Sequence, residues 1–335
     1  MARIALDAMG GDFAPFAPVG GALLALAELG AEHRIQLIGR ELDVSSTLAT
    51  ALHGEYAALA SHRDRIDIID APDVVAMADK PTAVIRRPHS SMSVGLRRIA
   101  DGAADAFVSA GNTGAQMAAS VQILGLHGGL KRPAIGTVFP TALQTVVVLD
   151  SGANVDCSPK ELLDFARLGL VYAEDILGRI NPVVGLLSIG EEPEKGNAVI
   201  KEAHKLLARS GLNFIGNVEG RDVATGSCDR GPFDVVVCDG FTGNVILKFY
   251  EGLAPTLIRM IADSTHADPH ELMKGLAHLD ASNYGGAPLL GVKGVSIIAH
   301  GSSSPRAIKN AVNVAVRATE SQMSEHIGRR LGVPG

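Results

Sequence analysis

The sequence predicts an α/β fold built on a large, mostly parallel sheet. Short apolar runs of the length of buried strands alternate with longer stretches of helical periodicity, and the first five of these segments span residues 3–6, 19–29, 34–38, 44–60 and 66–69. This alternation of strand and helix is typical of a parallel sheet with helical crossovers. Several apolar runs also end in short polar turns rich in glycine, as expected at the carboxyl edge of such a sheet.

The same alternation continues to the end of the chain. Further strands are expected at 106–109, 135–139, 145–149, 183–188, 213–216, 235–238 and 295–299. Further helices are expected at 94–101, 159–177, 198–209 and 305–327, and another should end near residue 126. A long helix is expected after residue 244, and Pro255 should kink or split it. The 335 residues suffice for one large core or for two lobes. Because no low-complexity linker interrupts the chain, we treat 1–335 as a single α/β domain and leave two interleaved lobes open.

The composition argues against nucleic acid as a partner and against secretion. Lys plus Arg number 30 against 36 Asp plus Glu, for a net charge of −6, so no basic excess is available to neutralise a phosphate backbone. The three cysteines form neither a metal pattern nor a disulfide framework, which is usual in a reducing cytoplasm. A strand pattern stands where a signal peptide would be. The uncharged run 106–126 is long enough to span a bilayer, but its polar, strand-like first part disfavours this reading.

Two similar turns mark the candidate site. Residues 234–248 contain a buried strand, the polar turn Asp239-Gly-Phe-Thr242-Gly243-Asn244 and the start of a helix, and the same x-x-Gly-x-Thr-Gly pattern occurs around Asn112-Thr113-Gly114. Backbone N–H groups at helix N-termini bind anions, and glycine lets a ligand approach closely. Each threonine can cap its helix, contact a ligand, or do both. The pattern therefore predicts a site for a phosphate-sized anion.

Other strand ends should bring polar residues to the same edge of the sheet. They include Asp7, Asn154 and His300. His300 can act as a general acid or hydrogen-bond donor, or it can simply bond to the backbone of its turn. Lys195 lies in an acidic loop bounded by glycines and can reach a ligand. Lys248 follows Thr242 by six residues and can either reach back across the helix start or remain a solvated lysine. The polar segment 70–93, punctuated by prolines, reads as an arm beside this edge.

Several familiar motifs are missing from the sequence. It contains no G-x-x-x-x-G-K-[ST], G-x-G-x-x-G, H-E-x-x-H, C-x-x-C or G-x-S-x-G pattern. We therefore expect no nucleotide or other cofactor and no metal ion. No nucleophile stands out either, because Cys238 falls within an apolar strand and Ser90 and Ser91 have no evident base nearby.

Longer blocks of the sequence resemble one family nearly from end to end: 7–12, 90–92, 104–115, 149–154, 190–197, 214–222, 234–248, 284–291 and 299–303. They are similar to blocks of the bacterial phosphate acyltransferases that make acyl phosphate from acyl carrier protein thioesters, the PlsX family. The resemblance implies transfer of a long-chain acyl group to inorganic phosphate for phospholipid synthesis. It also implies a homodimer with a three-layer α/β/α fold, similar to isocitrate and isopropylmalate dehydrogenases.

The resemblance also implies a place in the cell and further partners. Such enzymes work in the cytoplasm, at the membrane surface, and pass acyl phosphate to a membrane glycerol-3-phosphate acyltransferase. In this chain the segment 263–283 is shorter and more mixed in character than its counterpart in the family, so attachment to the membrane through an amphipathic element is left open. An acidic carrier protein needs a basic face, for which the arginines at 86, 87, 97 and 98 are candidates.

The expected chemistry needs no enzyme nucleophile, because a phosphate oxygen attacks the thioester carbon directly and the site must orient phosphate and stabilise an oxyanion. We predict a catalytic set of His300, Lys248, Lys195 and Asp239. We predict a set binding phosphate or acyl substrate at Asp7, Asn112, Thr113, Gly114, Asn154, Thr242, Gly243 and Asn244. Three alternatives stay open: an enzyme using coenzyme A thioesters, a dehydrogenase acting on a hydroxy acid, and a regulatory protein that binds phosphate or acyl groups without turnover.

Overall fold

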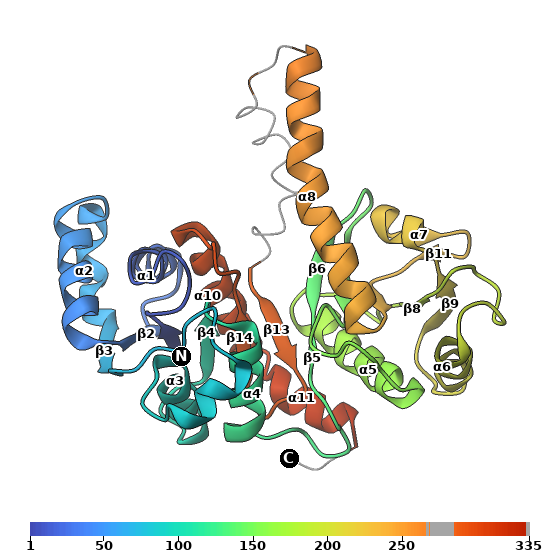
Figure 1. Ribbon diagram of the computed structural model, residues 1–335, viewed down its shortest axis with the longest axis horizontal. Coiled ribbons are helices and arrows are strands. Elements are labelled where there is room, and N and C mark those ends of the chain that lie inside the picture. The colour runs from blue at the N-terminus through green and yellow to red at the C-terminus, as the bar shows by residue number, and fades with distance from the viewer. Residues whose placement is uncertain (266–267, 269–284, 333–335) are drawn as a thin grey trace. The chain divides into compact units, whose positions relative to one another are not determined.

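The computed structural model describes residues 1–265, 268 and 285–332, and it divides the chain into two compact units. The first unit contains Met1–Pro133 and Gly285–Gly335, and the second contains Ala134–Tyr284. The chain therefore leaves the first unit once and returns to it (Figure 1). The predicted features at 266–267, 269–283 and Tyr284 lie outside the described residues.

The first unit contributes six strands to a sheet of order β3-β2-β1-β4-β14-β13-β5, whose last strand β5 is numbered with the second unit. All pairs from β3 to β14 are parallel, and β13 runs antiparallel to β14. The strands are β1 (Arg3–Asp7), β2 (Arg34–Gly39), β3 (Ile66–Asp70), β4 (Ala106–Ser109), β5 (Ala134–Ile135), β13 (Ala287–Leu290) and β14 (Val295–Ile298). The parallel core of this sheet confirms the predicted fold class.

Six α-helices and two 3₁₀ segments belong to the first unit. The helix α1 packs on α10, while α3 packs on β1, β2, β4 and on α4. The elements are α1 (Phe16–Glu28), α2 (Glu41–His53), η1 (Ala57–Arg65), η2 (Pro81–Arg86), α3 (Ser91–Ala100), α4 (Thr113–Ile123), α10 (Pro305–Glu320) and α11 (Met323–Arg330).

The second unit is built on a five-stranded sheet of order β6-β7-β12-β8-β9. Its pairs are parallel except β6–β7. The strands are β6 (Thr137–Pro140), β7 (Thr145–Leu149), β8 (Val184–Leu187), β9 (Phe214–Val218) and β12 (Val235–Val237), with a small hairpin of β10 (Ser227–Cys228) and β11 (Gly231–Pro232) beside them. The central strand β12 is fully buried, as expected for an apolar run inside a parallel sheet.

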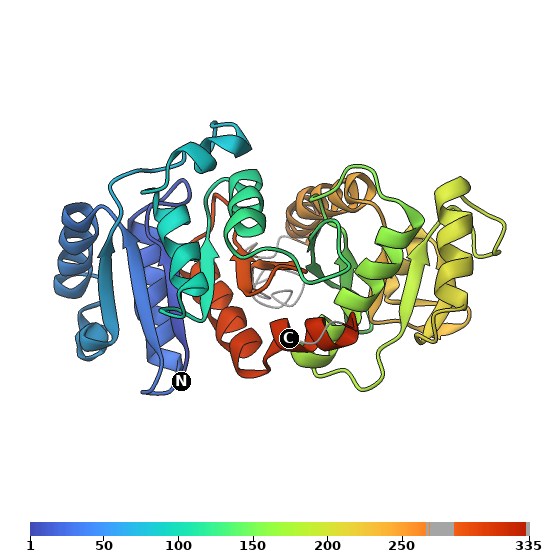
Figure 2. The same cartoon turned by 90° about the horizontal axis from the view of Figure 1, so that it is seen from below.

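Among the residues that the structure describes, the second unit also contains the helices α5 (Pro159–Asp175), α6 (Ala198–Ala208), α7 (Gly220–Thr225) and α8 (Gly240–Thr265). Figure 2 shows α5 and α6 beside the strands, and α5 packs on β7 and β12. The first turns of α8 pack Ile246, Leu247 and Tyr250 against the core, and the Tyr250 ring meets Phe139 edge-on at 5.6 Å. The large apolar residues on the rest of α8 are exposed, Phe249 and Leu257 among them.

The structure departs from the predicted elements at a few places. The strands form two main sheets instead of one, because the predicted strand at 135–139 is interrupted at Gly136, between β5 and β6. The predicted helix at 44–60 ends at His53 and continues as a 3₁₀ segment, and β13 was not predicted because it lies in a stretch rich in turn residues. The predicted split at Pro255 is wrong, since α8 is continuous to Thr265. The described helices include none long and apolar enough to cross a membrane.

Candidate active site

In the first unit, Asp7 holds the carboxyl ends of β1 and β4 together. Its Oδ2 accepts a hydrogen bond from the Ser109 hydroxyl at 2.7 Å, and its Oδ1 accepts one from the Met9 N–H at 3.0 Å. The Ser109 oxygen in turn accepts from the Gly111 N–H at 3.0 Å, so the carboxylate shapes the turn at 109–114. Burial raises the pKa of Asp7, and its hydrogen bonds oppose that shift. With only 2% of its surface exposed, Asp7 organises the edge and offers little to a substrate.

Asn112 caps α4, which corrects the expectation that Thr113 does so. The Asn112 Oδ1 accepts from the Ala115 N–H at 3.0 Å, and Thr113 is the first helical residue. The Asn112 amide group donates to the carbonyls of Met77 and Asp79 at 3.0 and 2.9 Å. The predicted arm at 70–93 therefore does lie beside this turn. The exposed Thr113 hydroxyl has no hydrogen bond to any described residue and is available to a ligand.

His300 follows β14 and is exposed at the same edge. Its Nδ1 accepts a hydrogen bond from the Ser302 backbone N–H at 3.3 Å and lies 2.8 Å from the Ser302 hydroxyl. Because Nδ1 acts as an acceptor, the neutral ring carries its hydrogen on Nε2. His300 can thus present an N–H donor, which an oxyanion requires. The strands β1, β4 and β14 that carry Asp7, the 109–114 turn and His300 are neighbours in the sheet.

In the second unit, Asp239 caps α8, so the expectation that Thr242 would do so is also wrong. The Asp239 Oδ1 accepts from the Thr242 N–H at 2.8 Å, and its Oδ2 accepts from the Thr242 hydroxyl at 3.0 Å. An aspartate at this position accepts from the third helical N–H, as capping residues do. Both the N–H group and the hydroxyl of Thr242 therefore donate to Asp239, and neither is free for a ligand.

Asp150 is a residue whose role the sequence did not reveal. It is fully buried at the end of β7, and its carboxylate accepts hydrogen bonds from the backbone N–H groups of Ile135, Gly152, Ala153 and Asn154 and from the Asn154 amide, at 2.7 to 3.2 Å. Burial raises the pKa of Asp150, against the effect of these hydrogen bonds. A buried acid at a strand end, followed directly by a glycine turn, was the available signal. Asn154, predicted to bind substrate, is held inside this network.

The loop at 150–154 packs tightly on the start of α8. The Gly240 N–H donates to the Asn154 carbonyl at 2.7 Å. A Cβ on Gly243 would lie 1.9 Å from the Asp150 carbonyl oxygen, so only glycine fits. Asn244 is exposed and lies beside Gly152, whose Cβ position is 3.5 Å from the Asn244 Oδ1. The loop and the helix start therefore form one rigid cradle, held together by backbone N–H groups that donate to Asp150, Asn154 and Asp239.

The two predicted lysines differ in their surroundings. Lys195 is exposed in the loop 189–197, and its ammonium pairs with no carboxylate of the described residues. Its loop is fixed to β9, because the Asn217 amide donates to the Glu192 carbonyl at 2.8 Å. Lys248, in contrast, forms an ion pair with Glu251 one turn further along α8, at 2.7 Å. Lys195 is thus the better placed of the two to balance the charge of phosphate.

Two cysteines of the second unit, Cys157 and Cys238, are poor nucleophiles. Burial, together with the nearby Asp150, raises the pKa of Cys157 to about 12. Burial likewise raises the pKa of Cys238 well above its usual value. Since the thiolate is the reactive form, both thiols are inert near neutral pH.

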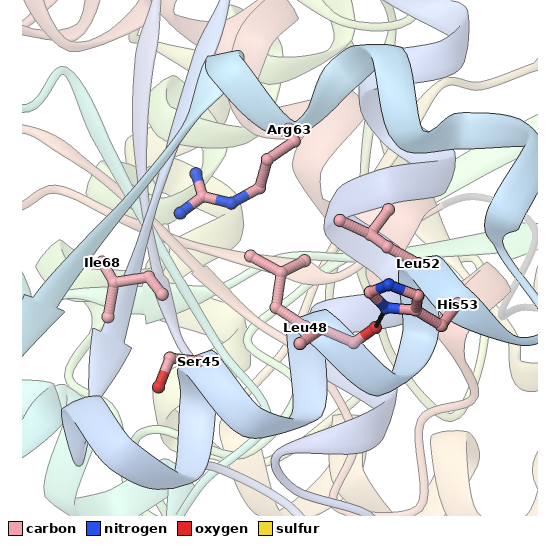
Figure 3. Close-up of a pocket in the computed structure, with 7 residues that line it drawn as sticks. Ser45, Leu48, Leu52, His53, Arg63 and Ile68 are labelled. Carbon is pink, nitrogen blue, oxygen red and sulfur yellow. Dashed lines mark hydrogen bonds between the residues drawn. The ribbon is translucent and has the colours of Figure 1, made fainter.

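Two other features lie apart from these loops. A cavity of about 290 Å³ under α2, lined by Leu48, His53, Arg63 and their neighbours, contains none of the predicted site residues (Figure 3). Glu32, His33 and Glu320 are close enough to hold a metal ion. However, the His33 Nδ1 accepts from the Ala2 N–H at 3.1 Å, which leaves the hydrogen on Nε2, the atom that faces the carboxylates. That arrangement favours hydrogen bonding over metal binding.

The fold places the protein among phosphotransacylase-like structures. A phosphotransacetylase from Streptococcus pyogenes is similar with a TM-score of 0.64, covering 95% of this chain and 94% of that one at 16% identity. A branched-chain phosphotransacylase from Enterococcus faecalis V583 is similar with a TM-score of 0.61, and the match covers 95% of this chain and 99% of that one at 14% identity. At such low identity, these likenesses concern the fold alone.

Sequence comparison then defines the family. A family model described as "Fatty acid synthesis protein" matches residues 2–326, and the chain belongs to this family. A protein of Desulforamulus reducens named phosphate acyltransferase is 46% identical, over 96% of this chain and 94% of that protein. One of the same name from Aquifex aeolicus is 43% identical, over 94% of this chain and 92% of that protein. The resemblance drawn from the sequence blocks is confirmed, and with it the class of enzyme, an acyltransferase.

Proposed function

We propose that this protein transfers a long-chain acyl group from acyl carrier protein to inorganic phosphate, giving acyl phosphate for phospholipid synthesis. The observation that carries the proposal is the set of strand-end loops that lead into helix N-termini and include Lys195, which pairs with no described carboxylate, in a chain of the phosphate acyltransferase family. Such loops suit a phosphate dianion. The inert thiols at this edge agree with a reaction that needs no acyl-enzyme intermediate.

In the proposed step, a phosphate oxygen forms a bond with the thioester carbonyl carbon. The carbon–sulfur bond then breaks, its electron pair leaves on sulfur, and the thiolate takes up a proton. His300 donates from Nε2 to the carbonyl oxyanion or to the leaving sulfur, and Ser302 keeps the ring in the required tautomer. Asp7 and Asp150 are positioning residues, because their carboxylates are consumed by the hydrogen bonds that shape the loops.

Each unit offers one helix start to phosphate, 112–114 in the first and 242–244 in the second, where Asp239 fixes the start of α8 and Lys195 balances the charge. Lys248 is the second candidate for that charge, once its ion pair with Glu251 opens. We propose that each of these loops contacts the substrate in a three-layer α/β/α fold of the isocitrate and isopropylmalate dehydrogenase type.

The carrier protein would dock on the exposed arginines of the 86–97 segment. Arg86 is exposed and has no hydrogen bond to a described residue, whereas Arg87 bonds to Asp79 and Arg98 to Gln36. Arg97 is exposed and donates to the Pro88 carbonyl at 2.7 Å, but it pairs with no carboxylate of the described residues. Arg86 and Arg97 are therefore the anchors that we propose for an acidic partner. An Arg86→Ala, Arg97→Ala double variant should raise KM for the carrier thioester and leave that for phosphate unchanged, and equal changes in both constants would exclude this docking face.

We also propose a homodimer formed through α8. Val245, Phe249, Leu253 and Leu257 recur every four residues and are exposed, which makes one apolar stripe that no described residue of this chain covers. A Phe249→Asp variant should elute as a monomer in size-exclusion chromatography with light scattering, and an unchanged mass would refute this interface. The protein would act in the cytoplasm, peripheral to the membrane, and supply a membrane glycerol-3-phosphate acyltransferase.

The choice of donor is tested by comparing two thioesters of the same acyl group. Palmitoyl acyl carrier protein and palmitoyl coenzyme A are each incubated with phosphate, and the acyl phosphate is trapped with hydroxylamine. The proposal predicts rapid, phosphate-dependent product from the carrier protein. Product from coenzyme A alone would favour a phosphotransacetylase-like enzyme, and binding of thioester without turnover would favour a regulatory protein.

A further inference from the structure

Three exposed apolar residues stand at the carboxyl edge of the second sheet, one on each of the loops that follow β7, β8 and β12. Val155 follows the loop 150–154 and is 65% exposed, Ile189 begins the loop 189–197 and is 81% exposed, and Phe241 lies in the turn 239–244 and is 64% exposed. Single exposed apolar residues are ordinary on protein surfaces. Here each of the three adjacent polar loops of the candidate site carries one.

The strand order and the hydrogen bonds bring these three residues to the same edge of the sheet. The strands β7, β12 and β8 are neighbours, with Val237 paired to both Leu149 and Leu186. The carboxyl ends of these three strands are therefore adjacent at one edge of the sheet. The hydrogen bond from the Gly240 N–H to the Asn154 carbonyl, 2.7 Å long, joins the residues that directly precede Phe241 and Val155.

The other end of the same strand gives a comparison. Ile180, four residues before β8 begins, is 97% exposed at the amino end, away from the polar loops. It shows what an isolated exposed isoleucine looks like in this unit, and it provides a matched control for Ile189. The two residues differ chiefly in which end of β8 they flank.

We infer that Val155, Ile189 and Phe241 form the surface that binds the first carbons of the acyl chain. The inference rests on the proposed function, in which the thioester carbonyl must meet phosphate at these loops. The alkyl chain must then leave a polar site, and each methylene taken out of water favours binding by about fourfold. An apolar side chain on each loop supplies that contact without disturbing the backbone N–H groups that hold phosphate.

The test compares long and short donors on the same carrier protein. The ratio of kcat/KM for hexadecanoyl over acetyl thioester, whose acyl group has a single carbon beyond the carbonyl, is measured for Val155→Ala, Ile189→Ala, Phe241→Ala and the control Ile180→Ala. We expect the ratio to fall about threefold for Val155→Ala and about tenfold for Ile189→Ala and Phe241→Ala, because less alkyl surface is covered. Ile180→Ala should keep the wild-type ratio.

Two further measurements keep the outcome clear. Thermal unfolding shows whether a variant has folded, and an Ile189→Asp variant, paired with Ile180→Asp, adds a charge at the same places. An unchanged ratio in all three alanine variants, or the same fall in Ile180→Ala, would overturn the inference, as would a loss of dimer mass in place of a change in ratio. An active wild type with unchanged ratios refutes only this inference. A wild type that forms no acyl phosphate from either donor refutes the proposed function and this inference with it.

Discussion

Replacing Gly243 with alanine tests whether the loop at 150–154 and the start of α8 form one rigid cradle. The new Cβ would lie 1.9 Å from the Asp150 carbonyl oxygen, more than 1 Å closer than the 3.0 Å that real Cβ atoms respect. The neighbour is backbone, so either the loop or the helix start must move by about 1 Å. Overpacking of this kind costs about 1–3 kcal/mol.

Gly252 provides the matched control in the same helix. A Cβ there meets nothing within 4 Å, so Gly252→Ala should gain helix propensity, by about 0.5–1 kcal/mol if the helix is otherwise unchanged. In urea unfolding, Gly243→Ala should lower the midpoint and Gly252→Ala should raise it slightly. Because the helix start at 242–244 is the part of the second unit assigned to phosphate, Gly243→Ala should also raise KM for phosphate by about tenfold or more. A Gly243→Ala protein as stable as Gly252→Ala, with the wild-type KM for phosphate, would refute the cradle.

Five further variants test single residues of the site. His300→Ala should lower kcat by about 100-fold with little change in KM, because the oxyanion donor acts in the transition state. Ser302→Ala should lower kcat less. Steady-state rates of His300→Ala equal to wild type would remove His300 from the mechanism. Lys195→Ala should raise KM for phosphate more than Lys248→Ala does, since Lys248 is paired with Glu251; the reverse order would assign the charge to Lys248. Cys157, with its pKa raised to about 12, should stay a thiol at pH 8 and resist iodoacetamide, and Cys157→Ser should remain active; rapid alkylation seen by mass spectrometry would contradict that burial.

Much of the fold could be predicted because each parallel strand is a local apolar run. The strand at 235–238, for example, is apolar throughout and proves to be central and buried. The division into two sheets could not be predicted, because the pairing of strands depends on contacts between distant residues. The run at 135–139 looks continuous in sequence, yet it is split at Gly136 between β5 and β6.

The candidate site was predictable as a set of loops but not as a set of roles. Strand ends placed Asp7, Asn154 and His300 at the expected edges. The capping residues were misassigned, although asparagine and aspartate are at least as good caps as threonine, and Asn112 and Asp239 precede the two threonines. Asp150 was missed as an organiser because its importance comes from five N–H donors that only the folded loop brings together.

The most direct test of the account is formation of acyl phosphate by the purified protein. Palmitoyl acyl carrier protein is incubated with phosphate, without ATP and with a chelator present, and palmitoyl hydroxamate is measured after hydroxylamine trapping. A parallel reaction replaces phosphate with sulfate, an anion of similar size. The account predicts hydroxamate formation that saturates with phosphate and is absent with sulfate. Thioester consumption at the same rate in both reactions, without acyl phosphate, would contradict it.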